Sequence, residues 1–298
     1  TVCFARAIAR RGVFNGDTTV ATIVVTIAAL LAIFMFFPVG KVLSAALFDE
    51  RGAFAPGLAA ARLFASDIWE IQCLTGGVHC GVAINSAILA TLVGLLSTFV
   101  GLVLALVVQR GGRRYAAVTK VMSILPIVTP PFVIALALVV LFGRTGIATT
   151  LLNDWFAIPR SRWLYGLPGV TLAQLLTFSP IAFLLLHGAL AAISPALEEA
   201  AQTLRASRWR IFRTVTLPLL RPALANAFLL GFVESLADFG NPLLLGGDMQ
   251  VLATAIYFAI VGARQDRVVA AILAMLLLAL MLAVFLAQRL LLSGRSFT

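Results

Sequence analysis

The stretch VAINSAILATLVGLLSTFVGLVLALVV, residues 82–108, contains 27 residues and no charged side chain. A helix that crosses a bilayer needs about 20 mostly apolar residues. A single segment in lipid must also satisfy its backbone polar groups within itself, which an α-helix does. The stretch therefore predicts a membrane-spanning helix and places the chain among integral membrane proteins.

Five more apolar stretches of similar length lie before and after this one. They cover Val20–Val39, Val121–Phe142, Val170–Ile193, Ala223–Gly246 and Val268–Ala287. A shorter apolar run, Val251–Val261, is too short to span and is expected to be re-entrant or interfacial. The predicted fold class is all-α, a polytopic membrane protein with about six transmembrane helices.

The composition of the whole chain agrees with this class. The 298 residues are 61% hydrophobic and 11% charged, whereas about a quarter of the residues of a soluble domain are charged. A soluble enzyme and a disordered chain are therefore excluded. The net charge of +10 does not require nucleic acid as a partner, because basic residues in so apolar a chain first indicate orientation in the bilayer.

Basic residues are distributed unequally over the connections between the spans. Fourteen of the 22 Lys and Arg residues fall on one side with three acidic residues, and eight fall on the other side with seven. Loops rich in Lys and Arg are normally cytoplasmic. We predict that both termini are cytoplasmic, as tails 1–19 and 288–298, and that residues 20–287 form the transmembrane core of one domain, 1–298.

Two cysteines, Cys73 and Cys80, close a short loop that is expected on the outer side. In an oxidising compartment they would form a disulfide, and two free thiols are the alternative. A metal site that includes His79 is disfavoured, because two thiols and one His at this spacing match no common zinc pattern. We predict no metal site.

The connection between the fourth and fifth spans, residues 194–222, is the longest on the basic side and is expected to hold two short helices. Ser194 and Ser207 are placed to cap these helices, and Pro218 is expected to end the second one. Apolar side chains such as Trp209 are typical of a helix that docks in a protein groove. An interfacial helix whose arginines face anionic lipid is the alternative.

The same connection resembles the EAA loop of ABC importer permeases. Glu199-Ala200-Ala201 and Val215-Thr216-Leu217-Pro218 match that pattern in residue type, spacing and place between spans, and the resemblance covers about residues 85–287. It implies a type I ABC importer permease-like fold in which residues 194–222 dock on a cytoplasmic ABC ATPase dimer. The residues that it assigns to this coupling are Glu199, Ala200, Ala201, Arg205, Leu217 and Pro218.

Arg205 is the one departure from the loop pattern, because the family usually has glycine at this position. Glycine would be required there only if the turn between the two helices needs a positive φ. The substitution therefore places the tight turn in question. Glu199 is expected to be a positioning contact.

The fifth predicted span contains two carboxylates, Glu234 and Asp238. Residues four apart project from one face of a helix, and Asn241 would follow one turn later. A carboxylate at the bilayer centre costs about 2.5–3.5 kcal/mol, so both should face the bundle interior or water. We interpret the three residues as candidates for a translocation path that touches a cationic substrate. Helix–helix hydrogen bonding, or a place for Asp238 near the outer end of the span, is the alternative.

The string ADFGNPLLLGG, residues 237–247, is similar to ferric-iron importer permeases, with phosphonate and polyamine permeases close behind. The resemblance implies a bacterial inner-membrane protein that receives ferric iron from a periplasmic substrate-binding protein. Ferric-iron permeases commonly fuse two six-span halves. With one EAA loop and Thr1 as its first residue, the chain is expected to be one such half, the N-terminal one, or a subunit that pairs with a second copy.

The sequence contains no phosphate-binding Gly-Lys-Ser/Thr motif. We therefore predict no catalytic residue and no cofactor in this chain, and expect the partner ATPase to use ATP. A protein of a different class stays open, namely an ion-coupled secondary transporter that protonates Glu234 or Asp238. An intramembrane enzyme is disfavoured, because His79 and His187 are the two histidines and lie on different segments.

Overall fold

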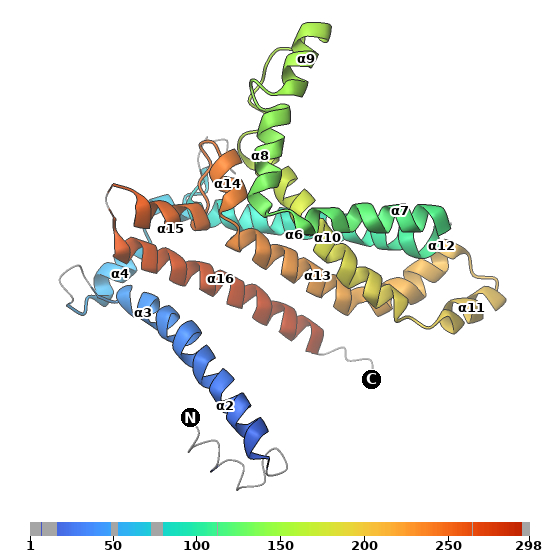
Figure 1. The fold of residues 1–298 in the computed structure, drawn as a ribbon, viewed down its shortest axis with the longest axis horizontal. Helices are drawn as coiled ribbons and strands as arrows, with labels where there is room; N and C mark the ends of the chain where they lie inside the picture. Colours follow the sequence, from blue (N-terminus) through green and yellow to red (C-terminus); the bar gives the residue numbers. More distant parts are fainter. Residues whose placement is uncertain are drawn as a thin grey trace.

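The computed structural model describes residues 7, 17–48, 53–72, 80–111, 113–263 and 265–293. In this part of the chain the secondary structure is helical, apart from an isolated β-bridge between Phe48 and Phe54. The predicted all-α class is confirmed. Figure 1 shows α6, α10 and α13 side by side, with α16 along α13 and α15.

The helices follow one another along the chain with short connections. They are α2 (Thr18–Leu31), α3 (Phe37–Ala45), α4 (Pro56–Leu63), α5 (Ser66–Trp69), α6 (Val82–Arg110), α7 (Arg113–Ile124), α8 (Pro131–Phe142), α9 (Ile147–Phe156), α10 (Leu167–Ala191), α11 (Pro195–Thr203), α12 (Arg208–Ile211), α13 (Leu217–Ala237), α14 (Gly240–Leu245), α15 (Leu252–Val261) and α16 (Arg267–Ser293). π-helical turns join α2 to α3 (Ala32–Phe36) and α12 to α13 (Phe212–Thr216).

Six helical stretches in the described part are long and apolar enough to cross a membrane. They are Thr18–Val42, Val82–Arg110, Pro131–Phe156, Leu167–Ala191, Arg208–Ala237 and Arg267–Leu290. The first, second, fourth and sixth predicted spans are confirmed, and their ends lie within a few residues of the predicted ones. The short run that was expected to be re-entrant or interfacial forms α15, which packs against α16.

The third predicted span, Val121–Phe142, is wrong in its extent. Helix α7 ends at Ile124, a 3₁₀ turn covers Leu125–Val128, and α8 starts only at Pro131. Prolines 126, 130 and 131 supply no backbone N–H, which disfavours a continuous helix here, and α8 begins at the last of them, since proline fits the first turn of a helix. The stretch long enough to span begins at Pro131 instead and continues into α9.

The fifth predicted span, Ala223–Gly246, is also shifted. The helix starts at Arg208, runs through the π-helical turn into α13 and ends at Ala237. Pro218 does not end the preceding helix, because the π-helical turn changes the hydrogen-bonding register just before the proline. In that turn the Leu217 N–H donates to the carbonyl of Phe212, five residues earlier.

Small residues allow the central helices to approach closely. A Cβ atom added to Gly101 on α6 would lie 2.7 Å from the backbone nitrogen of Phe183 on α10. Close backbone contact of this kind is how helices gain packing energy in lipid, where the hydrophobic effect does not drive them together. Helices α2 and α3 leave this bundle (Figure 1), and most of their apolar side chains are exposed.

Candidate functional site

The turn between α11 and α12 forms without glycine. Arg205 has a φ of 58°, in the left-handed region. The N–H of Arg205 donates to the carbonyl of Gln202 at 2.8 Å, and the N–H of Ala206 donates to that of Ala201 at 3.2 Å. These two bonds are the Schellman pattern at a helix C-terminus, which normally uses glycine at the left-handed position. The turn therefore does require a positive φ, and Arg205 adopts it.

The predicted helix caps have different outcomes. Ser207 Oγ accepts a hydrogen bond from the N–H of Arg210 at 3.3 Å, so the cap of α12 is confirmed. The cap of α11 is wrong, since the Ser194 side chain makes no such bond. The N–H of Leu197 donates to the Ser194 carbonyl instead, at 3.2 Å.

The outer face of α11 and the turn after it present exposed side chains. Glu199, Ala200 and Arg205 are exposed, and no side chain in the described part of the chain bonds to Glu199. Leu204 is 83% exposed and Trp209 is 68% exposed. Exposed apolar side chains on a loop between membrane spans are suited to contact a partner protein or the lipid interface.

The other residues that the sequence predicts for coupling have less exposed positions. Ala201 is half-buried on α11, and Leu217 and Pro218 are half-buried at the start of α13. The loop is anchored by a different carboxylate, that of Glu198, which pairs with Arg110 at the end of α6. The sequence did not predict this pair. The partners are 88 residues apart in the sequence, and no local pattern links them.

The backbone breaks between the two carboxylates of the fifth span. Helix α13 ends at Ala237, Asp238 is extended, and α14 begins at Gly240. The expectation that Glu234, Asp238 and Asn241 share one continuous helical face is therefore wrong. Asp238 Oδ1 accepts hydrogen bonds from the N–H groups of Gly240 at 3.0 Å and Asn241 at 3.3 Å. A short acidic side chain that accepts from the next free N–H groups favours such a helix start over a continuous helix.

The second oxygen of Asp238 joins a buried polar group, here called the Asp238 cluster (Gln174, Ser235, Asp238 and Asn241). Asp238 Oδ2 accepts from Gln174 Nε2 at 2.9 Å and from Asn241 Nδ2 at 2.6 Å. The Ser235 hydroxyl donates to Gln174 Oε1 at 2.6 Å. Gln174 and Asn241 are fully buried. Four donors therefore hold the Asp238 carboxylate in place and tie α10 to the break, which favours the alternative of helix–helix hydrogen bonding for this residue.

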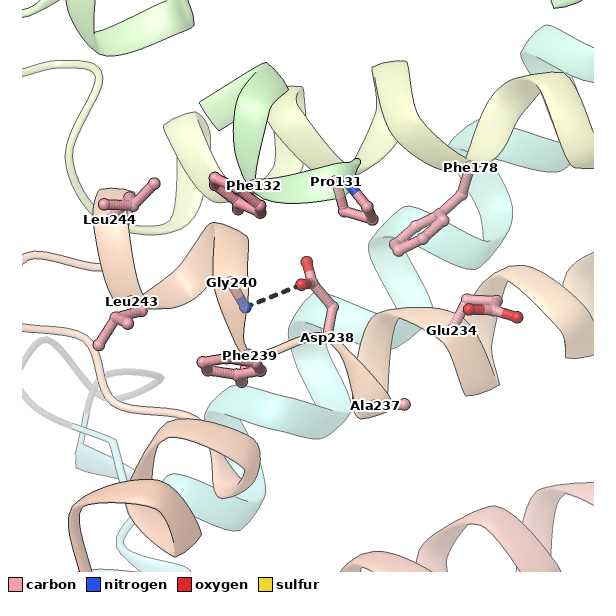
Figure 2. Close-up of a pocket in the computed structure, with 10 residues that line it drawn as sticks. All are labelled: Pro131, Phe132, Phe178, Glu234, Ala237, Asp238, Phe239, Gly240, Leu243 and Leu244. Carbon is pink, nitrogen blue, oxygen red and sulfur yellow. Dashed lines mark hydrogen bonds between the residues drawn. The ribbon is translucent and has the colours of Figure 1, made fainter. Parts of the chain in front are cut away.

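Glu234 faces a cavity of about 430 Å³ between α8, α10, α13 and α14. The residues that line this Glu234 cavity are Pro131, Phe132, Phe178, Glu234, Ala237, Asp238, Phe239, Gly240, Leu243 and Leu244. Figure 2 shows the carboxylates of Glu234 and Asp238 pointing in different directions. Among the described residues, no side chain bonds to the Glu234 carboxylate. A half-buried carboxylate without a protein partner, beside phenylalanine rings, is suited to contact a cation.

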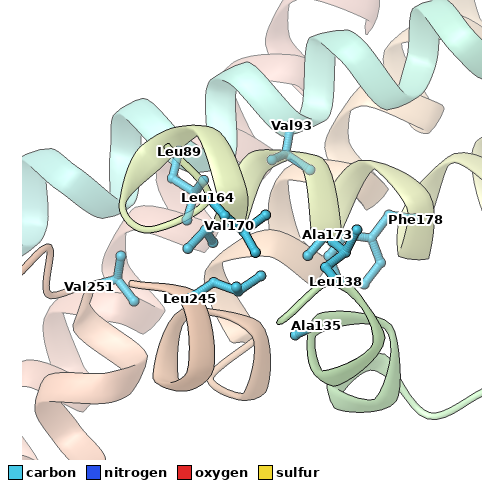
Figure 3. Close-up of a cluster of buried hydrophobic side chains, with 10 residues drawn as sticks. All are labelled: Leu89, Val93, Ala135, Leu138, Leu164, Val170, Ala173, Phe178, Leu245 and Val251. Atoms are coloured by element: carbon cyan, nitrogen blue, oxygen red, sulfur yellow. The ribbon is translucent and has the colours of Figure 1, made fainter. Parts of the chain in front are cut away.

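An apolar cluster shares one residue with the lining of this cavity. Figure 3 shows side chains of α6, α8, α10 and α14 that meet in this cluster, among them Leu89, Ala135, Ala173 and Leu245. Phe178 belongs both to this cluster and to the cavity lining. Phe178 therefore links the cavity to the packed interior of the bundle.

Neither Cys80 nor His187 lines the Glu234 cavity. Cys80 is disulfide-bonded, while Cys73 lies outside the described residues, so the pairing of these two remains a prediction. His187 stacks on Phe183 with ring centroids 5.5 Å apart, as a packing residue does. Within the described residues there is no group of three His, Cys, Asp or Glu side chains that could hold a metal ion.

A family model described as "Binding-protein-dependent transport system inner membrane component" matches residues 81–295. The chain belongs to this family. The matched residues include helices α6 to α16, and with them the loop, the break and the Glu234 cavity.

Several relatives of this chain are named for the substrate that they transport. The chain is 40% identical over 98% of its length to a putative ferric transport system permease protein of Haemophilus influenzae, and equally to a ferric transport system permease protein of Actinobacillus pleuropneumoniae. It spans 44% and 41% of those two proteins, less than half of their length. A molybdenum transport system permease protein of Escherichia coli is 35% identical over 45% of this chain and 58% of its own.

Solved structures share the fold of this chain. A chain of a bacterial alginate ABC transporter, in complex with a periplasmic protein that binds an alginate pentasaccharide, superposes with a TM-score of 0.77. It covers 95% of this chain and 96% of its own at 19% identity. The inward-facing MetNI methionine ABC transporter gives a TM-score of 0.52 over 72% of this chain and 95% of its own, at 17% identity. At such identity the likeness concerns the fold alone, and it confirms the expected ABC importer permease fold.

Proposed function

We propose that this chain forms half of the translocation pore of an ATP-driven importer for ferric iron. The observation that carries the proposal is the 40% identity to two ferric transport permeases over 98% of the chain. Because the chain spans less than half of each relative, a second permease half or a second copy of this chain would complete the pore. The complex would lie in a bacterial inner membrane with both termini of this chain in the cytoplasm.

The exposed face of α11 supports the proposed partner on the cytoplasmic side. Glu199 and Ala200 are exposed there, next to the apolar side chains of Leu204 and Trp209. This surface would dock in a groove of an ABC ATPase dimer. ATP would be bound and hydrolysed by that partner, and the chain itself would hold no cofactor and catalyse no reaction.

The Glu234 cavity supports a cationic substrate over an oxyanion. Molybdenum and sulfate permeases are also among the relatives. A free carboxylate repels an anion that passes it and attracts a cation, and the low dielectric of the membrane interior strengthens both effects. A periplasmic binding protein would deliver the iron to the outer side of the pore.

Uptake measured in cells tests the substrate. Cells that express the complete importer should accumulate radioactive ferric iron, and excess molybdate or sulfate should not compete with it. Cells that lack only this permease should lose the uptake. Accumulation of labelled molybdate or sulfate in place of iron, abolished by the same deletion, would contradict the proposal.

A further inference from the structure

The end of α6, the middle of α11 and the π-helical turn before α13 meet at one point. Arg110 Nη2 lies 3.0 Å from Glu198 Oε1, and the Thr216 hydroxyl donates to the same oxygen at 2.8 Å. Arg110 Nη2 also lies 3.5 Å from the Thr216 hydroxyl. The guanidinium carbon of Arg110 lies 5.8 Å from the centre of the Phe212 ring. We call Arg110, Glu198 and Thr216 the Arg110 joint.

The Arg110 joint is anchored in the bundle on one side and open on the other. Thr216 is fully buried, while the side chains of Arg110 and Glu198 are 40% and 31% exposed. An ion pair this exposed adds little to the free energy of folding. The pair therefore serves to fix the position of α11, because Arg110 and the buried hydroxyl of Thr216 both bind the same carboxylate oxygen of Glu198.

Few other contacts connect α11 to the membrane helices. In the described part of the chain, the bonds of Glu198 are the only side-chain hydrogen bonds from α11 to another helix. A cavity of about 290 Å³, lined by Arg110, Glu198, Gln202, Arg208 and Ile211, lies beside the joint. Displacement of α11 therefore meets little packing resistance except at Glu198.

The segment that contains Thr216 has a π-helical backbone. Thr216 is the last residue of the π-helical turn Phe212–Thr216. Such turns are rare, and they occur frequently at functional sites where a helix changes register. A pull on Thr216 acts at the point where α12 passes into α13, the helix that carries Glu234 toward the cavity.

We propose that Glu198 is a positioning residue that transmits movements of α11 to α6 through Arg110 and to α13 through Thr216. The inference rests on the proposed function, since it assumes an ATPase that moves α11. It divides the work of two adjacent glutamates. Glu199 faces outward to the partner, and Glu198 faces inward to the helices that form the pore.

The variant Glu198→Gln tests this division, because it keeps the size of the side chain and removes the charge that attracts Arg110. It should be measured in proteoliposomes that contain the complete importer, with iron uptake and ATP hydrolysis recorded on the same vesicles. We expect the ATPase to copurify as with wild type and to hydrolyse ATP. Iron transported per ATP should fall by about fivefold, the lower end of ordinary allosteric coupling.

A threonine pair provides the matched control. Thr216→Val removes the buried donor of the joint and should lower the transport-to-ATP ratio as Glu198→Gln does. Thr98→Val removes a half-buried hydroxyl of α6 that bonds only to the Gly94 carbonyl of its own helix, at 2.7 Å. That variant should keep the wild-type ratio.

A double-mutant cycle with Arg110→Met tests whether the residues act together. If they form one linkage, Arg110→Met with Glu198→Gln should lower the ratio no further than either single variant, whereas independent effects multiply. A wild-type ratio in both Glu198→Gln and Thr216→Val would overturn the inference, and so would loss of ATPase copurification in Glu198→Gln. Failure of the proposed function would look different, since wild-type vesicles would then show no ATP-driven iron uptake.

Discussion

The long loop and the predicted fifth span, residues 223–246, each contain a pair of carboxylates, and each pair consists of one anchored and one free group. In the loop, Glu198 is bonded to Arg110 and Thr216, whereas Glu199 is exposed. At the break, Asp238 accepts four hydrogen bonds, whereas Glu234 faces the cavity. In each pair the anchored carboxylate fixes the local geometry, and the free carboxylate is available for a partner or a substrate.

The largest expected effect comes from the free carboxylate of the loop. Glu199→Arg reverses the charge on the surface that would meet the ATPase, without touching any bond of the described fold. Transport should be abolished and copurification of the ATPase weakened, while the amount of protein in the membrane stays at the wild-type level. Membrane fractions, pull-down and uptake measure the three quantities. Normal transport in this variant would remove Glu199 from the docking surface.

The anchored carboxylate of the break should instead affect stability. Asp238→Ala leaves the buried amides of Gln174 and Asn241 without their acceptor, which should lower the free energy of unfolding by on the order of 3 kcal/mol. Thermal unfolding in detergent measures the loss. Asp154→Ala, on the exposed surface of α9, removes a carboxylate with no bond in the described chain and should change nothing. Equal unfolding temperatures for the wild type, Asp238→Ala and Asp154→Ala would contradict a structural role of Asp238.

The free carboxylate of the break should affect transport with little effect on stability. Glu234→Gln removes the charge and keeps the shape of the cavity. The initial rate of ferric iron uptake should fall about tenfold, equivalent to roughly 1.4 kcal/mol, with ATP hydrolysis retained. Glu234→Asp should keep more of the rate than Glu234→Gln does. If both variants transport at the wild-type rate, Glu234 does not meet the substrate.

The smallest effect concerns the turn that joins the two helices of the loop. Arg205 has a left-handed backbone, which costs a residue with a side chain about 1 kcal/mol more than glycine. Arg205→Gly should therefore stabilise the protein by up to that amount. Arg210→Gly, within α12, should destabilise it by a similar amount. The two unfolding temperatures should shift in opposite directions, and a shift of both in one direction would contradict the assignment of strain to Arg205.

Much of the fold could be predicted from the sequence, because lipid allows few backbone solutions. The apolar stretches at 82–108 and 268–287 are continuous and lie within helices α6 and α16. The third and fifth spans were misplaced where local chemistry interrupts an apolar pattern. In the third predicted span, Pro130 and Pro131 place the start of the helix at residue 131. In the fifth predicted span, Asp238 accepts hydrogen bonds at the start of a second helix, α14.

The pairs that build the site could not be predicted, because their partners are distant in the sequence. Gln174 and Asp238 are 64 residues apart, and Arg110 and Glu198 are 88 apart. The resemblance to the EAA loop pointed to Glu199, and residue type and spacing within an apolar stretch pointed to Glu234 and Asp238. Which of the carboxylates is anchored depends on helix packing, and only the structure separates Asp238 from Glu234.

The most direct test of the proposed function is the energy source of iron uptake. Vesicles that contain the complete importer should be supplied with ferric iron and binding protein on one side. They should then be energised either with ATP on the other side or with a proton gradient across the membrane. Uptake should require ATP and be insensitive to a protonophore. Uptake that follows the proton gradient without ATP would contradict an ATP-driven importer, and would favour a secondary transporter that protonates Glu234.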